Sequence, residues 1–244
     1  MHSAPEMVVL EDIQRAAWGY PETEVHPGNI FRIHAHVGGV VAAAFPASGG
    51  PAFGFVYGFP AYQGGRVWHH SHMLALRPEW RGTGAALALK QHQAARVREM
   101  GLATVTWTFD PLVARNARFN LGKLGARAVS YHPEWYVSGT LPADRLMVSW
   151  DVSKVQPERP AAPPSGLRVL EAVNLAPGTT DLTADAPRLL AEVPLDAYAL
   201  PAPLPLAWRL ALREVLGHYL GSGYVISDLA RAGERAFYVL ERSE

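Results

Sequence analysis

The order of hydrophobic and polar positions in the front part of the chain predicts alternating helices and strands. Residues 6–19 place apolar side chains at helical spacing and end at a glycine, which predicts an amphipathic helix. Residues 29–45 first alternate and then run apolar around a Gly-Gly pair, which predicts two strands or a bulged hairpin. Runs rich in aromatic and β-branched side chains predict further strands at residues 52–59, 67–76 and 103–109.

Two segments of helix formers complete the pattern of the front part. Residues 82–101 begin at glycines and end at Gly101, and residues 114–126 predict a second helix. Residues 128–138 and 145–152 then read as the last strands. The order of helix, strands, glycine-led helix, strand, helix and strands predicts an α/β fold with a mixed sheet.

A proline-rich segment divides the chain. Residues 154–165 contain four prolines among small residues, and such a segment cannot form a helix or a central strand. We therefore expect a linker between a domain at residues 1–153 and a smaller α/β region at residues 166–244. Within that region the pattern predicts a strand at 166–173, helices at 183–193 and 206–223, and two strands at 224–241.

The composition excludes several classes of function. Basic and acidic side chains number 22 each, so the net charge of zero gives no electrostatic footprint for nucleic acid or an anionic membrane. No apolar run reaches the roughly 18 residues of a membrane-spanning helix. The chain has no cysteine, which excludes disulfides and thiolate metal ligands and fits a cytoplasmic protein.

The sequence LALRPEWRGTGAALALK joins a strand to a helix through a glycine-containing turn. Such a turn leaves backbone N–H groups unpaired at the positive end of the helix dipole, where they can hold a phosphate or pyrophosphate. Gly82 and Gly84 let the backbone approach the anion, and Ala86 is small enough not to intrude. The turn lacks the Gly-Lys-Ser/Thr of a P-loop and the third glycine of a dinucleotide fingerprint.

Residues 81–86 resemble the acyl-CoA signature Arg/Gln-x-x-Gly-x-Gly/Ala of the GNAT superfamily of N-acetyltransferases. The strand before this segment, the helix after it and the next strand follow the order of that superfamily's second half. The stretch NARFNLGKLGA resembles its Asn-Ala…Leu-Gly-Phe element, with Asn116 and the Leu124-Gly125 pair in place. The resemblance implies a mixed, mostly antiparallel sheet flanked by helices, with acyl-CoA as co-substrate.

The resemblance also implies which residues hold acyl-CoA. Backbone N–H groups around Leu74–Leu76, in the strand before the turn, would polarise the thioester carbonyl. Asn116 would hydrogen-bond the pantetheine arm. Lys90, Lys123 and Arg127 would meet the CoA phosphates unless they are ordinary surface charges. The expected acyl-CoA-binding residues are Leu74, Ala75, Leu76, Arg81, Gly82, Thr83, Gly84, Ala85, Ala86, Asn116, Phe119 and Lys123.

Further stretches resemble a narrower group, the acyltransferases linked to N-succinylamino-acid racemases. The stretches HSHMLAL, WTFDPL and LPADRL carry this resemblance. It implies transfer of a succinyl group from succinyl-CoA to the amine of a D-amino acid, with acetyl-CoA as the alternative donor. Arg145, Arg32 or a protonated histidine would bind the distal carboxylate, although arginines at strand ends are often merely solvated or ion-paired. Trp107 would line the acyl channel, although aromatic side chains of strands are often packed in a core. Domains of this kind often pair, so a homodimer is a further expectation.

Two departures from the superfamily pattern affect the expected chemistry. Leu121 occupies the position of the tyrosine that protonates the leaving thiolate, so this acid is absent or supplied elsewhere, with Tyr131, Tyr136 and Tyr62 as candidates. No strand pattern precedes residues 6–19, where the superfamily has its first strand. We expect the tail, through the strand at 166–173, to fill this gap or to cap the acceptor pocket.

The attacking amine must lose a proton, which calls for a base. His70 and His72 lie just before the carbonyl-polarising residues, and a neutral imidazole accepts a proton at neutral pH. On a regular strand these two side chains would face one side, and His69, Ser71 and Met73 would face the other. The two histidines could instead be ordinary hydrogen-bonded residues of a sheet.

Other side chains offer alternative chemistry. Asp110 is the rival base or amine anchor, and its alternative role is to cap the following turn. A metal would need a third ligand besides His70 and His72, and His34 and His36 repeat the spacing on the strand expected there. Because no carboxylate–histidine spacing typical of metal sites accompanies them, no metal is expected.

The sequence therefore supports two functions from different classes. The first is an acyl-CoA-dependent N-acyltransferase that acts on a small amine, with no covalent enzyme intermediate. The second is a non-catalytic module that binds or senses acyl-CoA, and Leu121 is the feature that favours it.

Overall fold

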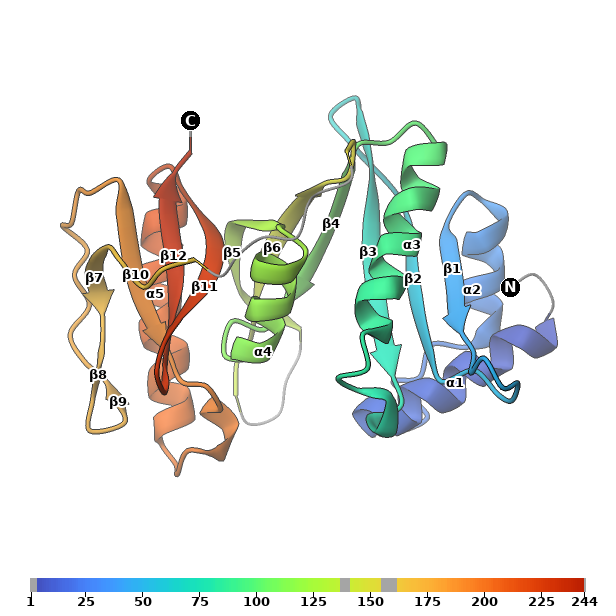
Figure 1. Cartoon of the computed structure of the whole chain (residues 1–244), viewed down its shortest axis with the longest axis horizontal. Helices are drawn as coiled ribbons and strands as arrows, with labels where there is room; N and C mark the ends of the chain where they lie inside the picture. The colour runs from blue at the N-terminus through green and yellow to red at the C-terminus, as the bar shows by residue number, and fades with distance from the viewer. Residues whose placement is uncertain (1–3, 137–140, 155–161, 244) are drawn as a thin grey trace. The chain divides into compact units, whose positions relative to one another are not determined.

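The computed structural model describes residues 4–136, 141–154 and 162–243 (Figure 1). The chain forms two compact units. The first unit contains residues 1–107 and 151–155, and the second contains residues 108–150 and 156–244.

The division into units differs from the predicted domains. The chain changes unit inside strand β4 (Thr104–Phe109), again at the end of β6 (Ala143–Asp151), and a third time at residues 155–156. Only the last change falls in the predicted linker, of which residues 155–161 lie outside the described residues. The first two occur inside strands, where the hydrophobic pattern shows no break.

The sheet of the first unit contains β1 (Val40–Ala44), β2 (Gly54–Gln63), β3 (Arg66–Leu76) and the start of β4. The pairs β1–β2 and β2–β3 are antiparallel, whereas β3–β4 is parallel. The strands predicted at residues 52–59, 67–76 and 103–109 are therefore confirmed.

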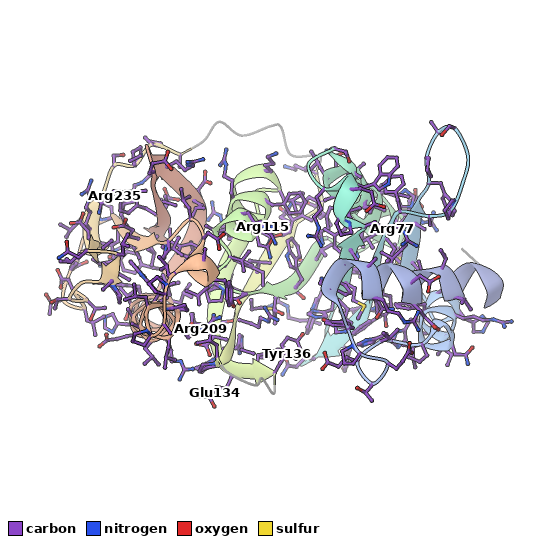
Figure 2. All side chains as sticks on the ribbon, turned by 90° about the horizontal axis from the view of Figure 1, so that it is seen from below. Arg77, Arg115, Glu134, Tyr136, Arg209 and Arg235 are labelled. Atoms are coloured by element: carbon purple, nitrogen blue, oxygen red, sulfur yellow. The ribbon has the colours of Figure 1, made fainter. Side chains whose placement is uncertain are left out.

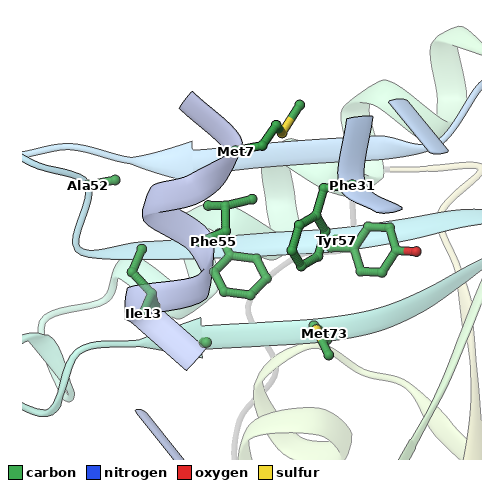
Figure 3. Close-up of a cluster of buried hydrophobic side chains, with 9 residues drawn as sticks. Met7, Ile13, Phe31, Ala52, Phe55, Tyr57 and Met73 are labelled. Carbon is green, nitrogen blue, oxygen red and sulfur yellow. The ribbon is translucent and has the colours of Figure 1, made fainter. Parts of the chain in front are cut away.

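Helices cover both faces of this sheet. Because successive side chains of a strand point to opposite faces, Phe55 and Val56 of β2 enter different cores. Phe55 packs with residues of α1 (Ala4–Trp18) and α2 (Gly28–His36), and Figure 3 shows this cluster. Val56 packs with Leu89 of α3 (Ala85–Glu99).

The helix α2 replaces the strand that was predicted at the start of residues 29–45, so that prediction is wrong. Phe31 is buried while Ile33 is 55% exposed, which is a helical arrangement, because residues two apart on a strand share a face. Gly38 follows the helix with a φ of +92°, a conformation that favours glycine after a helix end. The Gly-Gly pair therefore stops a helix and does not mark a bulge between strands.

The second unit has its own set of strands. Their order is β6-β5-β11-β12-β10-β7, and neighbours are antiparallel except β10 and β7. The short strands β8 and β9 pair only with each other among the described residues. The bounds are β5 (Arg127–Tyr136), β7 (Leu167–Leu170), β8 (Ala172–Val173), β9 (Ala176–Pro177), β10 (Arg188–Val193), β11 (Tyr224–Ala232) and β12 (Arg235–Arg242).

Helical segments of the second unit include one long helix. The helix α5 (Leu204–Gly221) confirms the prediction at residues 206–223. The helix α4 (Ala114–Ala117) continues into a π-helical turn at Arg118–Lys123, and together they correspond to the helix predicted at 114–126.

The remaining tail predictions are confirmed in part. Residues 224–241 form β11 and β12, as expected. The predicted helix at residues 183–193 is wrong, because Arg188–Val193 is the strand β10. All of residues 189–193 are buried, so this apolar run is a central strand and not one face of a helix. The strand predicted at 166–173 is β7, and it pairs with β10, a strand of the tail itself, so it does not fill the place of a missing first strand.

The packing of α2 predicts how two substitutions on this helix change the free energy of unfolding. Phe31→Ala removes a fully buried ring from the core and should lower the free energy of unfolding by about 3–5 kcal/mol, measured by urea denaturation. Ile33→Ala on the same helix should change it by no more than about 0.5 kcal/mol. Equal losses for both variants would contradict the helical placement, since only a strand would bury both side chains alike.

Candidate functional site

A glycine turn joins β3 to α3 in the first unit. A short 3₁₀ helix, Pro78–Trp80, follows the strand, and the ring of Trp80 stacks on Phe53 at a centroid distance of 3.8 Å. Gly82 and Gly84 then adopt φ values of +81° and +89°. These left-handed conformations favour glycine, so the sequence specifies the turn locally.

The turn presents backbone donors at the start of α3. The first helical hydrogen bond runs from Ala88 N–H to Gly84 C=O, and no side chain caps the helix. The N–H groups of the preceding residues are thus left for an external acceptor. A Cβ added to Gly82 or Gly84 would meet no atom within 4 Å, so the space beside the turn is open. An exposed turn with these donors and the positive helix end suits an anionic group such as a phosphate.

Side chains of the turn hold its conformation. The guanidinium of Arg81 donates to the carbonyl of Ala17 at 2.7 Å, which ties the turn to α1. The hydroxyl of Thr83 donates to the carbonyl of Trp80 at 2.8 Å. Both residues were predicted to hold acyl-CoA, and these bonds place their side chains in the scaffold of the turn.

The strand β3 is paired on only part of its second edge. Its described pairs with β4 are His69 with Val105 and His70 with Thr106. On the other edge, Arg77 N–H donates to Phe53 C=O. Because N–H groups alternate in direction along an antiparallel strand, those of Leu74 and Leu76 point away from β2. Two of the predicted carbonyl-polarising donors therefore face the edge beyond the recorded β4 pairs, whereas Ala75 N–H faces β2.

An irregularity in β3 changes which side chains share a face. The register with β2 shifts between Tyr57, which pairs with Met73, and Gly58, which pairs with Ser71, so His72 is an extra residue. Such a bulge turns the strand and lets neighbouring side chains face the same way. Met73 packs in the α1–α2 core, the side on which His72 contacts His26. The predicted placement of Met73 opposite His72 is therefore wrong.

The imidazoles of His70 and His72 lie among other aromatic side chains. Nδ1 of His70 lies 3.0 Å from the hydroxyl of Thr106. Nε2 of His72 lies 3.4 Å from Nε2 of His26. Both rings also contact the ring of Phe59. The two predicted bases are thus neighbours on one face of β3.

Burial keeps these imidazoles neutral. Burial and then the positive charge of Lys90 lower the pKa of His70. Burial, followed by His26, His70 and His34, lowers the pKa of His72 to about 4. Neutral imidazoles at neutral pH have lone pairs that can accept a proton.

The opposite face of β3 carries a buried polar network. The ammonium group of Lys90 on α3 donates to Ser71 at 3.0 Å and to Gln93 at 2.9 Å, and it lies 3.7 Å from the ring centroid of Trp107. Burial lowers the pKa of Lys90 to about 7. The predicted acyl-channel residue Trp107 is mostly buried, and one face of its ring is occupied by Lys90.

Asp110 lies in an ion pair of the second unit. Its carboxylate accepts two hydrogen bonds from Arg209, at 2.7 and 3.0 Å, and others from Tyr198 and from the N–H of Leu112. Arg209 projects from α5 (Figure 2). Burial raises the pKa of Asp110, but the hydrogen bonds and charge of Arg209 outweigh it and hold the pKa below its usual range. The alternative prediction, capping of the following turn, is seen in the bond to Leu112.

Four other predicted residues of the second unit lie on three elements. Asn116 lies on α4, Phe119 and Lys123 lie on the π-helical turn after it, and Arg145 lies on β6. Asn116 and Lys123 are exposed, and Phe119 is half-buried. Arg145 is half-buried, and its guanidinium lies 5.0 Å from the ring centroid of Tyr136 at the end of β5, the tyrosine labelled in Figure 2. No contact of these four side chains within the described residues indicates what they would bind.

The tyrosine candidates differ in availability. Leu121 is fully buried, so its position offers no acid. Tyr131 donates to Asp144 at 2.7 Å, and burial together with that bond raises its pKa. Tyr136 is exposed, and Tyr62 is 74% exposed.

Sequence reasoning missed His26 and Tyr57 as part of this site. It offered Lys90 as a contact of the CoA phosphates, whereas the ammonium group of Lys90 is buried and donates to Ser71 and Gln93. The Tyr57 hydroxyl contacts His34 Nδ1, and its ring lies edge-on to His72. His26 stands 46 positions before His72, and no spacing rule links a loop to a strand at that separation. Lys90 occupies a helical position whose burial depends on the sheet beneath it. Only the three-dimensional arrangement identifies these residues.

Two further features limit the chemistry that the described residues offer. No group of three His, Cys, Asp or Glu side chains there is arranged to hold a metal ion. His34 and His36 lie on α2 and not on a strand, which removes the spacing that suggested a metal. No helix in the described part of the chain is long and apolar enough to span a membrane.

Comparison with known proteins identifies the fold. No family model matches the sequence, and no curated protein matches it. Among solved structures, the ribosomal-protein-S18-alanine N-acetyltransferase from Escherichia coli aligns with 63% of this chain and 92% of its own, at 14% identity and a TM-score of 0.52. A protein assigned to the GNAT family from Desulfovibrio desulfuricans aligns with 62% of this chain and 96% of its own, at 16% identity and a TM-score of 0.52.

A third solved structure adds a bound ligand to the comparison. A protein assigned as an acetyltransferase from Salmonella typhimurium, solved with its cofactor acetyl-CoA, aligns with 62% of this chain and 90% of its own, at 13% identity and a TM-score of 0.51. The chain thus has the mixed α/β fold of GNAT acetyltransferases, with mostly antiparallel strands and flanking helices.

The buried histidines predict a pH dependence of stability. Burial, followed by Lys90 and His70, lowers the pKa of His69 to about 4, as burial and neighbouring imidazoles do for His72. In the unfolded chain both titrate near 6.5, so between pH 6.5 and 4 the unfolded state binds more protons and stability falls as the pH falls.

The measurement is urea denaturation at several pH values in this window. His69→Gln and His72→Gln should each reduce the slope of the unfolding free energy against pH. His36→Gln changes an exposed imidazole and should leave the slope unchanged. Identical slopes in all three variants would mean that the two buried histidines protonate normally.

Proposed function

We propose that the protein is an acyl-CoA-dependent N-acyltransferase of the GNAT type, acting by direct attack of an amine on the thioester. The observation that carries the proposal is the open glycine turn of residues 82–84, which leads into α3 and follows the part of β3 that lies beyond its described pairs with β4. The fold shared with acetyltransferases supports it, including the one solved with acetyl-CoA.

The turn would bind the pyrophosphate of CoA. Its open backbone donors and the positive end of α3 match a doubly charged group without requiring a basic side chain. Ala85 and Ala86 at the start of the helix leave room for the ligand. Asn116, Phe119 and Lys123 are proposed to contact the rest of CoA.

The edge of β3 beyond its described pairs with β4 would hold the thioester. The N–H groups of Leu74 and Leu76 point to that edge, and a fixed donor there can stabilise the negative charge that develops on the carbonyl oxygen. Because only the short 3₁₀ helix separates β3 from the turn, the strand and the turn would position both ends of the reactive arm.

The base is proposed to be His72 or His70. Their lowered pKa values keep both neutral, so each can take the amine proton. Asp110 is the weaker candidate, because Arg209 already holds its carboxylate. The thiolate would take a proton from the amine, from water or from an accessible phenol such as Tyr62 or Tyr136, since Tyr131 already donates to Asp144.

The finer identity of the substrates follows from the sequence resemblance. We favour succinyl-CoA as donor over acetyl-CoA, and an amino acid, of the D configuration, as acceptor. Arg145 is proposed to bind the distal carboxylate and Trp107 to border the acyl group. A cytoplasmic homodimer belongs to the same proposal.

The experiment that tests the function is a thiol-release assay. Wild-type protein is given acetyl-CoA or succinyl-CoA with D- or L-amino acids, and the product is identified by mass spectrometry. His70→Ala, His72→Ala and Asp110→Ala are compared, and loss of the base should lower kcat at least about tenfold, or ~1.4 kcal/mol of barrier. Tight CoA binding without thiol release for any amine would favour a non-catalytic acyl-CoA sensor, for which the buried Leu121 is the supporting observation.

The glycine turn makes a prediction for binding. Gly84→Ala forces a side chain into a left-handed conformation at about 1–2 kcal/mol and should weaken acetyl-CoA binding about tenfold, measured by calorimetry. Gly101→Ala imposes the same strain at a φ of +75°, just beyond the opposite end of α3, with no atom within 4 Å of the added Cβ. It should lose similar stability but keep its affinity. If both variants bind as the wild type does, the turn is not the CoA site.

A further inference from the structure

A loop between α1 and α2 holds a second imidazole against His72. The Nε2 atoms of His26 and His72 lie 3.4 Å apart, and their ring centroids are 5.3 Å apart. For these nitrogens to hydrogen-bond, one must carry the hydrogen and the other must accept it, because two neutral lone pairs repel. The pair is therefore arranged to share a single hydrogen.

A buried side chain of α1 fixes the position of His26. The amide oxygen of Gln14, a fully buried residue of α1, accepts from the N–H of His26 at 2.8 Å, and its nitrogen donates to the carbonyl of His26 at 3.0 Å. The same nitrogen donates to the carbonyl of Leu10 at 3.2 Å. An amide with partners on both ends is held in one orientation, so the loop presents His26 through specific contacts.

The end of the loop is fixed as well. The carboxylate of Glu11, also on α1, accepts from the N–H of Gly28 at 2.7 Å. Glu11 and Gln14, about one turn apart on α1, therefore hold the backbone on either side of Pro27. This arrangement aims one loop histidine at the extra residue of the β3 bulge.

The groups that face His72 come from four elements. They are the imidazole of His26 from the loop, that of His34 from α2, that of His70 from β3 and the phenol ring of Tyr57 from β2. Burial, followed by the three imidazoles, lowers the pKa of His72, which keeps its ring neutral.

We propose that His72 and His26 form a two-imidazole proton relay for the acyl transfer, with Gln14 as the positioning residue of His26. This inference rests on the proposed function. The amine nitrogen bonds to the carbonyl carbon, the C–S bond breaks, and the thiolate leaves with the electron pair. An ammonium acceptor loses two protons on becoming an amide: one leaves through the relay, and the other ends on the thiolate.

The relay moves one proton by two short transfers. Nδ1 of His72 takes the proton from the amine while the Nε2 hydrogen of His72 passes to Nε2 of His26. The hydrogen on Nδ1 of His26 is then released to solvent, which leaves both rings neutral but in the opposite tautomers. Exchange of the ring hydrogens with solvent after product release restores the starting tautomers. His26 is only half-buried, which gives that hydrogen a route out.

The test compares His26→Ala and Gln14→Leu with His36→Ala, an exposed histidine of α2, in the thiol-release assay. His26→Ala should lower kcat at least tenfold with acyl-CoA affinity unchanged, and added imidazole should restore part of the rate. Its acidic limb of kcat/KM should move to higher pH, because the neighbour that lowers the pKa of His72 is gone. Gln14→Leu should lower kcat less, and His36→Ala should match the wild type.

The outcomes separate the relay from the function itself. Wild-type kcat and pH profile in His26→Ala overturn the relay. So does a lower rate that imidazole does not restore and whose pH limb has not moved, because His26 would then be merely structural. If the wild type binds acyl-CoA but releases no thiol with any amine, the proposed function fails, whatever the variants do.

Discussion

The extra residue at His72 in β3 determines what each face of the first unit's sheet presents. Before the shift in register, the strand alternates regularly, so His69 and Ser71 face the polar network under α3. After it, Met73 packs in the core under α1 and α2, on the same side as His72. Without the bulge, the strand could not place imidazoles on one face and still fill both cores beyond them.

The same strand also connects the two proposed binding functions. Its described pairing with β4 covers only His69 and His70, and the N–H groups of Leu74 and Leu76 point to the edge beyond those pairs. Six residues after Leu76 the chain enters the left-handed conformations of the glycine turn. A thioester and a pyrophosphate could therefore be held by backbone groups alone, which leaves the side chains of β3 free for proton transfer.

Sequence patterns predicted those parts of this arrangement that are specified locally. Glycines before a run of helix formers specify the turn at residues 82–84, and aromatic and β-branched runs specify β2, β3 and β4. The prediction of a strand in place of α2 was wrong, because alternating polar and apolar residues also fit a short helix that buries the face carrying Phe31. The prediction of a helix at residues 183–193 was wrong, because a short, mostly apolar run such as residues 188–193 fits a buried strand equally well.

Features that depend on distant partners could not be predicted. The bulge at His72 is a property of the register between β2 and β3, and no residue within β3 specifies it. The contact between His26 and His72 depends on Gln14, which holds the loop from α1. The capping role of Asp110 was a local alternative, but its ion pair with Arg209 joins residues 99 positions apart.

The most direct test of the account is the change in backbone amide NMR signals when acetyl-CoA is added to the ¹⁵N-labelled protein. The largest shifts should occur at the N–H groups of residues 82–86 and of Leu74 and Leu76, and Ala75 should be affected less because its N–H faces β2. Binding that leaves these signals in place and moves others would contradict the proposed acyl-CoA site, because the anion and the thioester would then be held elsewhere.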